Sequence, residues 1–150
     1  MLELNASFTS WRQLCQQQQA TLSQHFTTGV PLNTLLLDHS QFTDQLLRAI
    51  WQQCGLDQEP GLQLIAIGGY GQQTLFPFSD IDVLIIYSNM TSGLRELLEQ
   101  WVSHLWDCHL QLSQYVLDIA ALSSKLQQDF IFLMPHATAE ILPLIMCQNY

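Results

Sequence analysis

Two short apolar runs, Leu64–Ile67 and Asp80–Tyr87, constrain the fold of this chain more than any other feature. Runs of this length and composition are typical of β-strands that are buried on both faces. Residues 70–76 lie between them and predict one or two helical turns. An amphipathic helix pattern follows over Leu94–Trp106. Strands that alternate with helices predict an α/β or α+β domain, with a small mixed sheet and flanking helices.

The N-terminal part of the chain shows helical spacing. Trp11, Leu14, Leu22 and Phe26 are spaced like one apolar stripe of a helix, which ends at Gly29-Val30-Pro31. We expect tryptophans in the core or in domain contacts, and there are four: Trp11, Trp51, Trp101 and Trp106.

A second helix is predicted over residues 32–55. Asp38 or Ser40 is expected to cap its main part, and Gly55 is expected to end it. We therefore divide the chain into an N-terminal helical region, residues 1–58, and a core, residues 59–150, which stops soon after its last predicted strand.

Residues 107–118 alternate between polar and apolar side chains and predict a third strand. Asp107, His109 and Gln111 share one parity on that strand, so they are expected on one face of the sheet. Residues 119–150 are predicted to be helical, with breaks at prolines.

The charge balance excludes one class of function. The chain has four Lys+Arg against thirteen Asp+Glu, a net charge of −9. Extended nucleic acid is bound through a basic surface that neutralises phosphates. The cations here are far apart in the sequence: Arg12, Arg48, Arg95 and Lys125. A single nucleotide remains compatible, because backbone N–H groups and metal ions also hold phosphates.

The sequence shows no pattern of a membrane span or a signal peptide, and its cysteines do not form a metal-binding motif. No apolar run reaches the roughly 18 residues that a membrane span needs, and no signal-peptide pattern begins the sequence. The cysteines have no metal-binding spacing, and free thiols in a reducing, cytoplasmic compartment are expected for all four: Cys15, Cys54, Cys108 and Cys147.

The acidic pair Asp80 and Asp82 breaks the apolar pattern of the second strand. Side chains two residues apart on a strand point to the same face, about 7 Å apart along it. Two unpartnered carboxylates would repel each other, and burial would favour their protonation. A divalent cation removes both penalties, and Mg²⁺ (or Mn²⁺) is commonly bound by carboxylates together with substrate phosphates.

The glycines after the first strand suggest where a phosphate would lie. Gly68 and Gly69 allow the backbone to approach a ligand closely, and a helix start that follows them presents N–H groups. Ser79 stands beside Asp80, where its hydroxyl would orient that carboxylate or contact a phosphate. The alternative is structural: a tight turn formed by the glycines, and an Asp80 that merely begins a strand near solvent.

One combination of residues is much more specific than its parts. Gly68-Gly69-Tyr70-Gly71, Leu75, Pro77, Ser79-Asp80-Ile81-Asp82 and Leu84 together resemble the signature of the bacterial PII uridylyltransferases. Their nucleotidyltransferase domain belongs to the DNA polymerase beta superfamily. The likeness covers approximately residues 40 to 145.

The resemblance implies a fold, a reaction and site residues. It implies a metal-dependent transfer of UMP from UTP, or another nucleoside triphosphate, to a tyrosine of PII, a small nitrogen-signalling protein. Gly68 and Gly69 would hold the triphosphate. Asp80 and Asp82 would bind Mg²⁺ and so stabilise charge at the α-phosphate and on the leaving pyrophosphate.

The sequence departs from the family pattern where the family carries charge. Residues 72–74 are Gln-Gln-Thr where the family has Arg-Gly-Glu, and Gln111 stands where it has the glutamate that supplies a third metal ligand. Gln114 and Leu117 replace a histidine and an arginine. The family's other domains, helical, phosphohydrolase-type and regulatory, are not in this sequence.

These departures leave three alternatives open: a working transferase, a catalytically degenerate binding or regulatory module, and a fragment of a longer enzyme. Asp107 shares the predicted strand parity of Gln111, but four residues of strand separate them by about 13 Å. His109 lies between the two and is either a ligand or an ordinary surface histidine.

Overall fold

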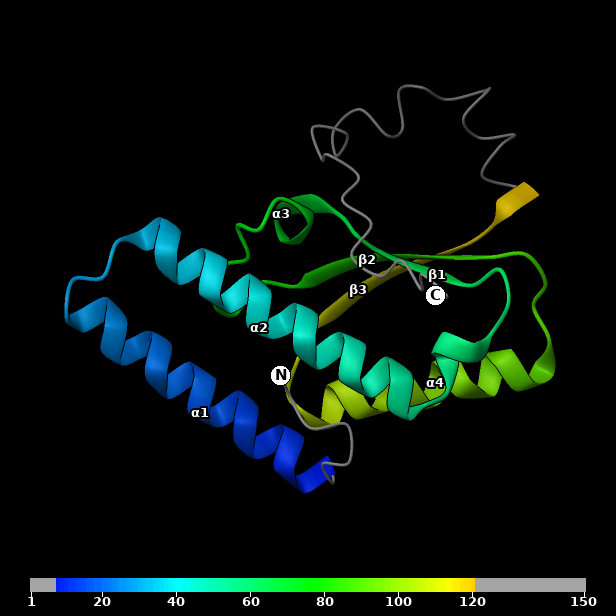
Figure 1. The fold of residues 1–150 in the computed structure, drawn as a ribbon, viewed down its shortest axis with the longest axis horizontal. Helices are drawn as coiled ribbons and strands as arrows, with labels where there is room; N and C mark the ends of the chain where they lie inside the picture. The colour runs from blue at the N-terminus through cyan, green and yellow to red at the C-terminus, as the bar shows by residue number, and fades with distance from the viewer. Residues whose placement is uncertain (1–7, 121–150) are drawn as a thin grey trace.

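The computed structural model describes residues 8–120 (Figure 1). Its elements are α1 Phe8–Thr27, α2 Leu32–Gln53, the 3₁₀ helix η1 Leu56–Gln58, β1 Gln63–Ala66, α3 Gly68–Gly71, β2 Ile81–Tyr87, α4 Ser92–Asp107 and β3 Leu112–Asp118. The predicted order of helices and strands is confirmed over this range. From residue 121 onward, the helix predicted over 119–150 lies outside the described residues, as does Cys147.

The sheet has three strands in the order β1-β2-β3. β1 pairs with β2 in antiparallel fashion, and β2 pairs with β3 in parallel. Ile81, Val83 and Ile85 of β2 are buried in one core cluster with apolar residues of α2 and α4. Because side chains alternate along a strand, Asp82 and Leu84 point to the opposite face. The expected small mixed sheet with flanking helices is therefore confirmed.

The helical layer is built on two tryptophans. The rings of Trp51 on α2 and Trp101 on α4 pack edge to face, with centroids 5.1 Å apart and an interplanar angle of 89°. Trp11 of α1 is also buried, and its Nε1–H donates to Oε1 of Gln53 at 3.0 Å. Figure 1 shows α1 and α2 side by side as a helical hairpin.

Three large apolar side chains of the helices are not buried in the core. Trp106 is 65% exposed, because it follows Leu105, which is fully buried, by one residue and so points away from the core. Phe26 is 70% exposed and Leu32 49%. Both lie at the tip of the α1–α2 hairpin, which projects beyond the sheet in Figure 1.

The predicted C-terminal end of α2 is confirmed, and its predicted N-cap is wrong. The helix begins at Leu32 after Pro31, whose φ of −55° suits entry into a helix without a side-chain cap. Asp38 and Ser40 lie inside the helix, so the predicted cap at either residue was wrong. At the other end, Gly55 follows the C-cap residue and takes a left-handed φ of 76°, as predicted.

The described cysteines carry the free thiols that the sequence predicts. Cys15, Cys54 and Cys108 are free thiols. Between residues 8 and 120, none of the helices combines the length and apolarity needed to cross a bilayer.

Candidate nucleotide site

The site is organised by backbone pairing between the first two strands. Ala66 pairs with Val83, and the N–H of Ile67 donates to the carbonyl of Asp82 at 3.0 Å. The antiparallel ladder therefore continues up to the glycine turn. The turn begins at Gly68 and forms a single helical turn, α3, two residues earlier than the predicted 70–76. This register lays the turn beside the acidic end of β2.

Gly68 and Asp82 are in direct contact. Gly68 has a φ of +62°, and a Cβ built on it would lie 2.8 Å from Oδ2 of Asp82. A side chain at position 68 would therefore meet both an unfavourable backbone conformation and the carboxylate. The absence of that side chain lets Asp82, which is half-buried, turn its carboxylate toward the glycine turn.

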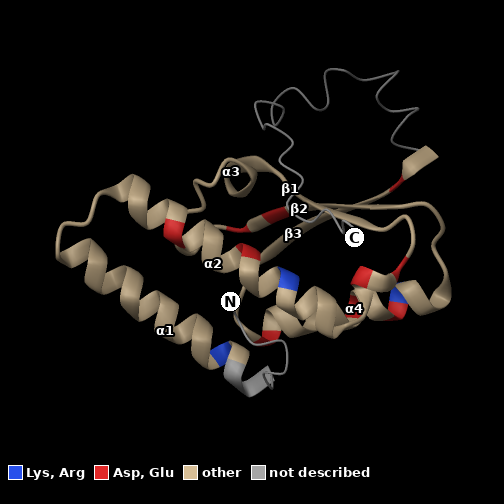
Figure 2. Ribbon diagram, in the orientation of Figure 1, with Lys and Arg blue, Asp and Glu red and all other residues tan. Residues whose placement is uncertain are grey.

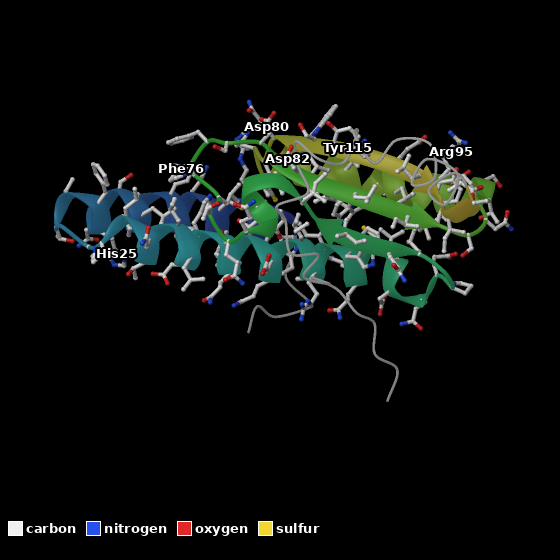
Figure 3. The ribbon with its side chains drawn as sticks, turned by 90° about the horizontal axis from the view of Figure 1, so that it is seen from above. His25, Phe76, Asp80, Asp82, Arg95 and Tyr115 are labelled. Carbon is white, nitrogen blue, oxygen red and sulfur yellow. The ribbon has the colours of Figure 1, made fainter. Side chains whose placement is uncertain are left out.

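Asp80 lies just before β2 and is exposed. The hydroxyl of Ser113 donates to its Oδ2 at 3.4 Å, a long contact. Ser113 is also the register partner of Asp82 on the parallel strand. Figure 3 shows Asp80 and Asp82 close together, with Tyr115 farther along the sheet. Ser113 joins the two acidic positions, and the sequence pattern did not identify it, because a lone serine on a strand carries no motif.

Gln111, at which the resemblance implies a third ligand, stands one residue before β3. Its carbonyl accepts a hydrogen bond from the N–H of Ile81 at 2.8 Å, which continues the parallel register to the level of Asp80. Of Gln111 and Ser113, the serine lies on the strand and contacts an acidic side chain, whereas Gln111 precedes the strand by one residue.

The alternative ligand Asp107 is not on this strand. It is the last residue of α4, and β3 begins only at Leu112. The parity argument for Asp107 was therefore wrong, because the alternating pattern began inside the helix. His109 stands in the intervening turn with a φ of 58° and also lies outside the strand.

The two remaining predicted residues are Gly69, which lies in the glycine turn, and Ser79, which lies in the segment between that turn and β2. The carbonyl of Gly69 accepts two hydrogen bonds from Thr74, from its N–H at 2.9 Å and from its Oγ1 at 3.0 Å. Ser79 is exposed next to Asp80, and its N–H donates to the carbonyl of Phe76 at 3.1 Å. The structure thus brings Gly68, Asp80 and Asp82 to one corner, with Gly69 and Ser79 in the adjoining turns.

The third glycine of the turn has a packing role. A Cβ on Gly71 would lie 2.8 Å from the carbonyl oxygen of Ala66, which is backbone and cannot move aside. Sequence analysis assigned Gly71 no such role, since the contact depends on how α3 folds back against β1.

Charge at this corner is acidic. Figure 2 shows acidic residues at the start of β2, whereas Lys and Arg lie on the helices. The sequence has no Lys or Arg between Arg48 and Arg95. Within residues 8–120, no group of three His, Cys, Asp or Glu side chains is arranged to hold a metal ion. The candidate site therefore contains two carboxylates, with the Ser113 hydroxyl beside Asp80 and the backbone of Gln111 at the same level of the sheet.

Comparison with known families decides the class of protein. The nucleotidyltransferase domain family matches residues 47–141, which include all of the sheet and the glycine turn. The chain belongs to this family. The mixed three-stranded sheet of this nucleotidyltransferase domain is consistent with the polymerase beta-like fold.

Curated relatives are similar over the same region. A bifunctional uridylyltransferase/uridylyl-removing enzyme of Stutzerimonas stutzeri (strain A1501) is 33% identical over 130 residues, which are 85% of this chain and 14% of the relative. An enzyme of the same name from Vibrio atlanticus (strain LGP32) is 38% identical over 96 residues, 63% of this chain and 11% of the relative. The resemblance to the uridylyltransferase family is confirmed, and the chain spans about one seventh of the first relative's length.

The packing of Gly71 predicts a large difference between two glycine substitutions. Gly71→Ala should lower the free energy of unfolding by about 1–3 kcal/mol, because the new methyl group meets backbone. Gly93→Ala is the matched control: it lies in the first turn of α4, with no atom closer than 3.9 Å to the added Cβ, and should raise stability by up to about 1 kcal/mol. Urea unfolding measures both, and equal values would contradict this role of Gly71.

A second prediction concerns Gln73, which has a φ of 58° where the related family carries glycine. A left-handed conformation costs an L-residue about 1–2 kcal/mol. Gln73→Gly should therefore leave stability unchanged or raise it by up to about 1 kcal/mol. Gln72→Gly, at a φ of −90°, should lower it by about 0.5–1 kcal/mol. Thermal unfolding should give a lower melting temperature for Gln72→Gly and an equal or higher one for Gln73→Gly, and a loss of stability in Gln73→Gly would exclude strain at this position.

Proposed function

We propose that this domain transfers UMP from UTP to a tyrosine hydroxyl of a PII-type signalling protein, with Asp80 and Asp82 holding a divalent cation. The observation that carries the proposal is the contact between the Asp82 carboxylate and Gly68, at the start of a turn built for close backbone approach. The similarity to enzymes named uridylyltransferase supports UMP as the transferred group.

The residues at the corner fit Mg²⁺ or Mn²⁺. Asp80 is exposed and Asp82 half-buried, so their carboxylates are hard oxygen ligands within reach of solvent and substrate. Mg²⁺ is usually held by one or two carboxylates, with waters and substrate phosphates completing its shell. Two carboxylates are therefore enough when the nucleotide binds with the ion. The bound ion would supply charge stabilisation at the α-phosphate and on the leaving pyrophosphate.

The remaining residues of the corner position the nucleotide. Gly68 and Gly69 would lie against the triphosphate, because neither carries a side chain that holds it away. Ser79, exposed beside Asp80, would donate its hydroxyl to a phosphate oxygen. The acceptor tyrosine would approach from the face of the sheet that carries the acids, since the opposite face is covered by α2 and α4.

A second candidate is a nucleotide-binding or regulatory module that does not catalyse transfer. It is favoured by Gln111, a neutral side chain at the level of Asp80 where the related family has a glutamate. An amide oxygen is a weaker metal ligand than a carboxylate and does not act as a base. This candidate shares the binding site and differs from the first only in turnover, which UMP incorporation into PII distinguishes.

Binding of UTP with Mn²⁺ should stabilise the folded chain. At about 100 times the dissociation constant, a ligand that binds only the native state adds about 2.7 kcal/mol. Asp82→Asn should abolish this stabilisation, because the cation loses a charged ligand. Asp38→Asn, which removes the same charge from an exposed position on α2, should retain it. Thermal unfolding with and without UTP measures the effect, and a wild-type chain that gains no stability would refute the proposed function.

Restoring a carboxylate at position 111 should strengthen metal binding. Gln111→Glu adds a charged oxygen beside Asp80 and should lower the dissociation constant for Mn²⁺ with UTP at least about tenfold, or 1.4 kcal/mol. Gln114→Glu adds the same charge to β3 at the opposite parity and should change it less than twofold. Paramagnetic relaxation by Mn²⁺ measures both constants. Equal effects of the two variants would show that only net charge matters.

A further inference from the structure

The glycine turn is anchored to α2 through the hydroxyl of Tyr70. Tyr70 is 2% exposed, and its hydroxyl donates to Oδ1 of Asp44 at 2.6 Å. A buried hydroxyl needs a partner, and a bond to a carboxylate is stronger than one between neutral groups. The middle of the Gly-Gly-Tyr-Gly turn is therefore attached to a helix that lies 26 residues earlier in the chain.

A second anchor holds the far end of the same segment. Ser40 is 1% exposed, and its Oγ accepts a hydrogen bond from the N–H of Leu75 at 3.2 Å while donating to the carbonyl of Leu36 at 2.8 Å. Ser40 and Asp44 are four residues apart, so they lie on one face of α2, one turn from each other. The segment from Tyr70 to Leu75 is thus held at both ends by a single helix face.

Burial of Asp44 destabilises its ionised carboxylate, and the hydrogen bond from Tyr70 in the turn counteracts this effect. Burial raises the pKa of the Asp44 carboxyl, whereas the hydrogen bond from Tyr70 and the charge of Arg48 favour its ionised form. The helix that carries Asp44 is itself fixed by the Trp51–Trp101 contact with α4. The anchors therefore connect the turn to a helix that is packed into the core.

We propose that Asp44 and Ser40 are positioning residues for nucleotide binding, which act by fixing where Gly68 and Gly69 meet the phosphates of the nucleotide. The inference rests on the proposed function, because it assigns these two residues to the same site. Neither residue touches the corner where Asp82 meets Gly68. Both act through the backbone of the turn, which Thr74 closes onto Gly69.

The test compares hydroxyl deletions that do or do not reach the turn. Tyr70→Phe and Ser40→Ala each remove one anchor and should weaken binding of UTP with Mn²⁺ by about fivefold to tenfold, or about 1–1.4 kcal/mol, because the turn is then held at one end only. The matched control is Thr43→Val. Thr43 is 1% exposed, and its Oγ1 donates only within α2, to the carbonyl of His39 at 2.9 Å. It should lower the melting temperature and change the dissociation constant less than twofold.

Binding of UTP is measured by calorimetry well below the melting temperature of every variant. All variants are then folded, so a loss of stability alone does not change the dissociation constant. The double variant Tyr70→Phe with Asp44→Asn should bind UTP no more weakly than whichever of the two single variants binds it more weakly. The reason is that both substitutions break the same hydrogen bond. If wild type binds UTP and the anchor variants match Thr43→Val, the positioning role is wrong while the proposed function stands. If wild type does not bind, both fall.

Hydrogen exchange provides a second measurement that needs no nucleotide. The amides of Gly71 to Leu75 should exchange at least about fivefold faster in Tyr70→Phe and Ser40→Ala than in Thr43→Val. Protection equal to that of wild type in the anchor variants would overturn the proposal, even for a variant whose binding changes.

Discussion

The antiparallel pairing of Ile67 with Asp82 is the constraint on which the site depends. The hydrogen bond from the N–H of Ile67 to the carbonyl of Asp82 brings the last residue before the turn level with the second aspartate. Gly68 then follows at the one position where a side chain would displace that carboxylate. A slip of one residue in this register would move Asp82 to the other face of the sheet and separate it from the turn.

The alternation along β2 keeps the core apart from the site. Ile81, Val83 and Ile85 join the cluster with the helices, and Asp82 lies between them with its side chain on the other face. One strand thus supplies both the centre of the hydrophobic core and an acidic residue that reaches solvent. The carboxylate of Asp82 is thereby fixed by a buried strand, so its position depends little on loop conformation, whereas Asp80 lies one residue before that strand.

Two departures from the related family, Gln73 and Gln111, lie next to this corner, and they differ in their physical consequences. Gln73 has a left-handed backbone, a conformation that a glycine at this position would adopt without strain. Gln111 keeps its position in the register but has no charge to offer a cation. The glycine turn and the strand register are therefore present while charge is missing at position 111, which is why binding and turnover need separate experiments.

The sequence alone determined the order of the elements and the acidic pair, because strands, helices and turns have local periodicities and glycine patterns. It also placed Gly68, Gly69 and Asp82 in one motif. It did not determine where β3 begins, since the alternation that starts at Asp107 includes the last residue of α4 and the turn after it. It also did not determine the exposure of Trp106, which depends on how α4 packs. Only tertiary structure decided that Asp44, Ser40 and Ser113 serve the same corner. These contacts join residues that are 26 to 35 positions apart in the chain. Strand register and the packing of α2 fix such contacts, and no local pattern encodes them.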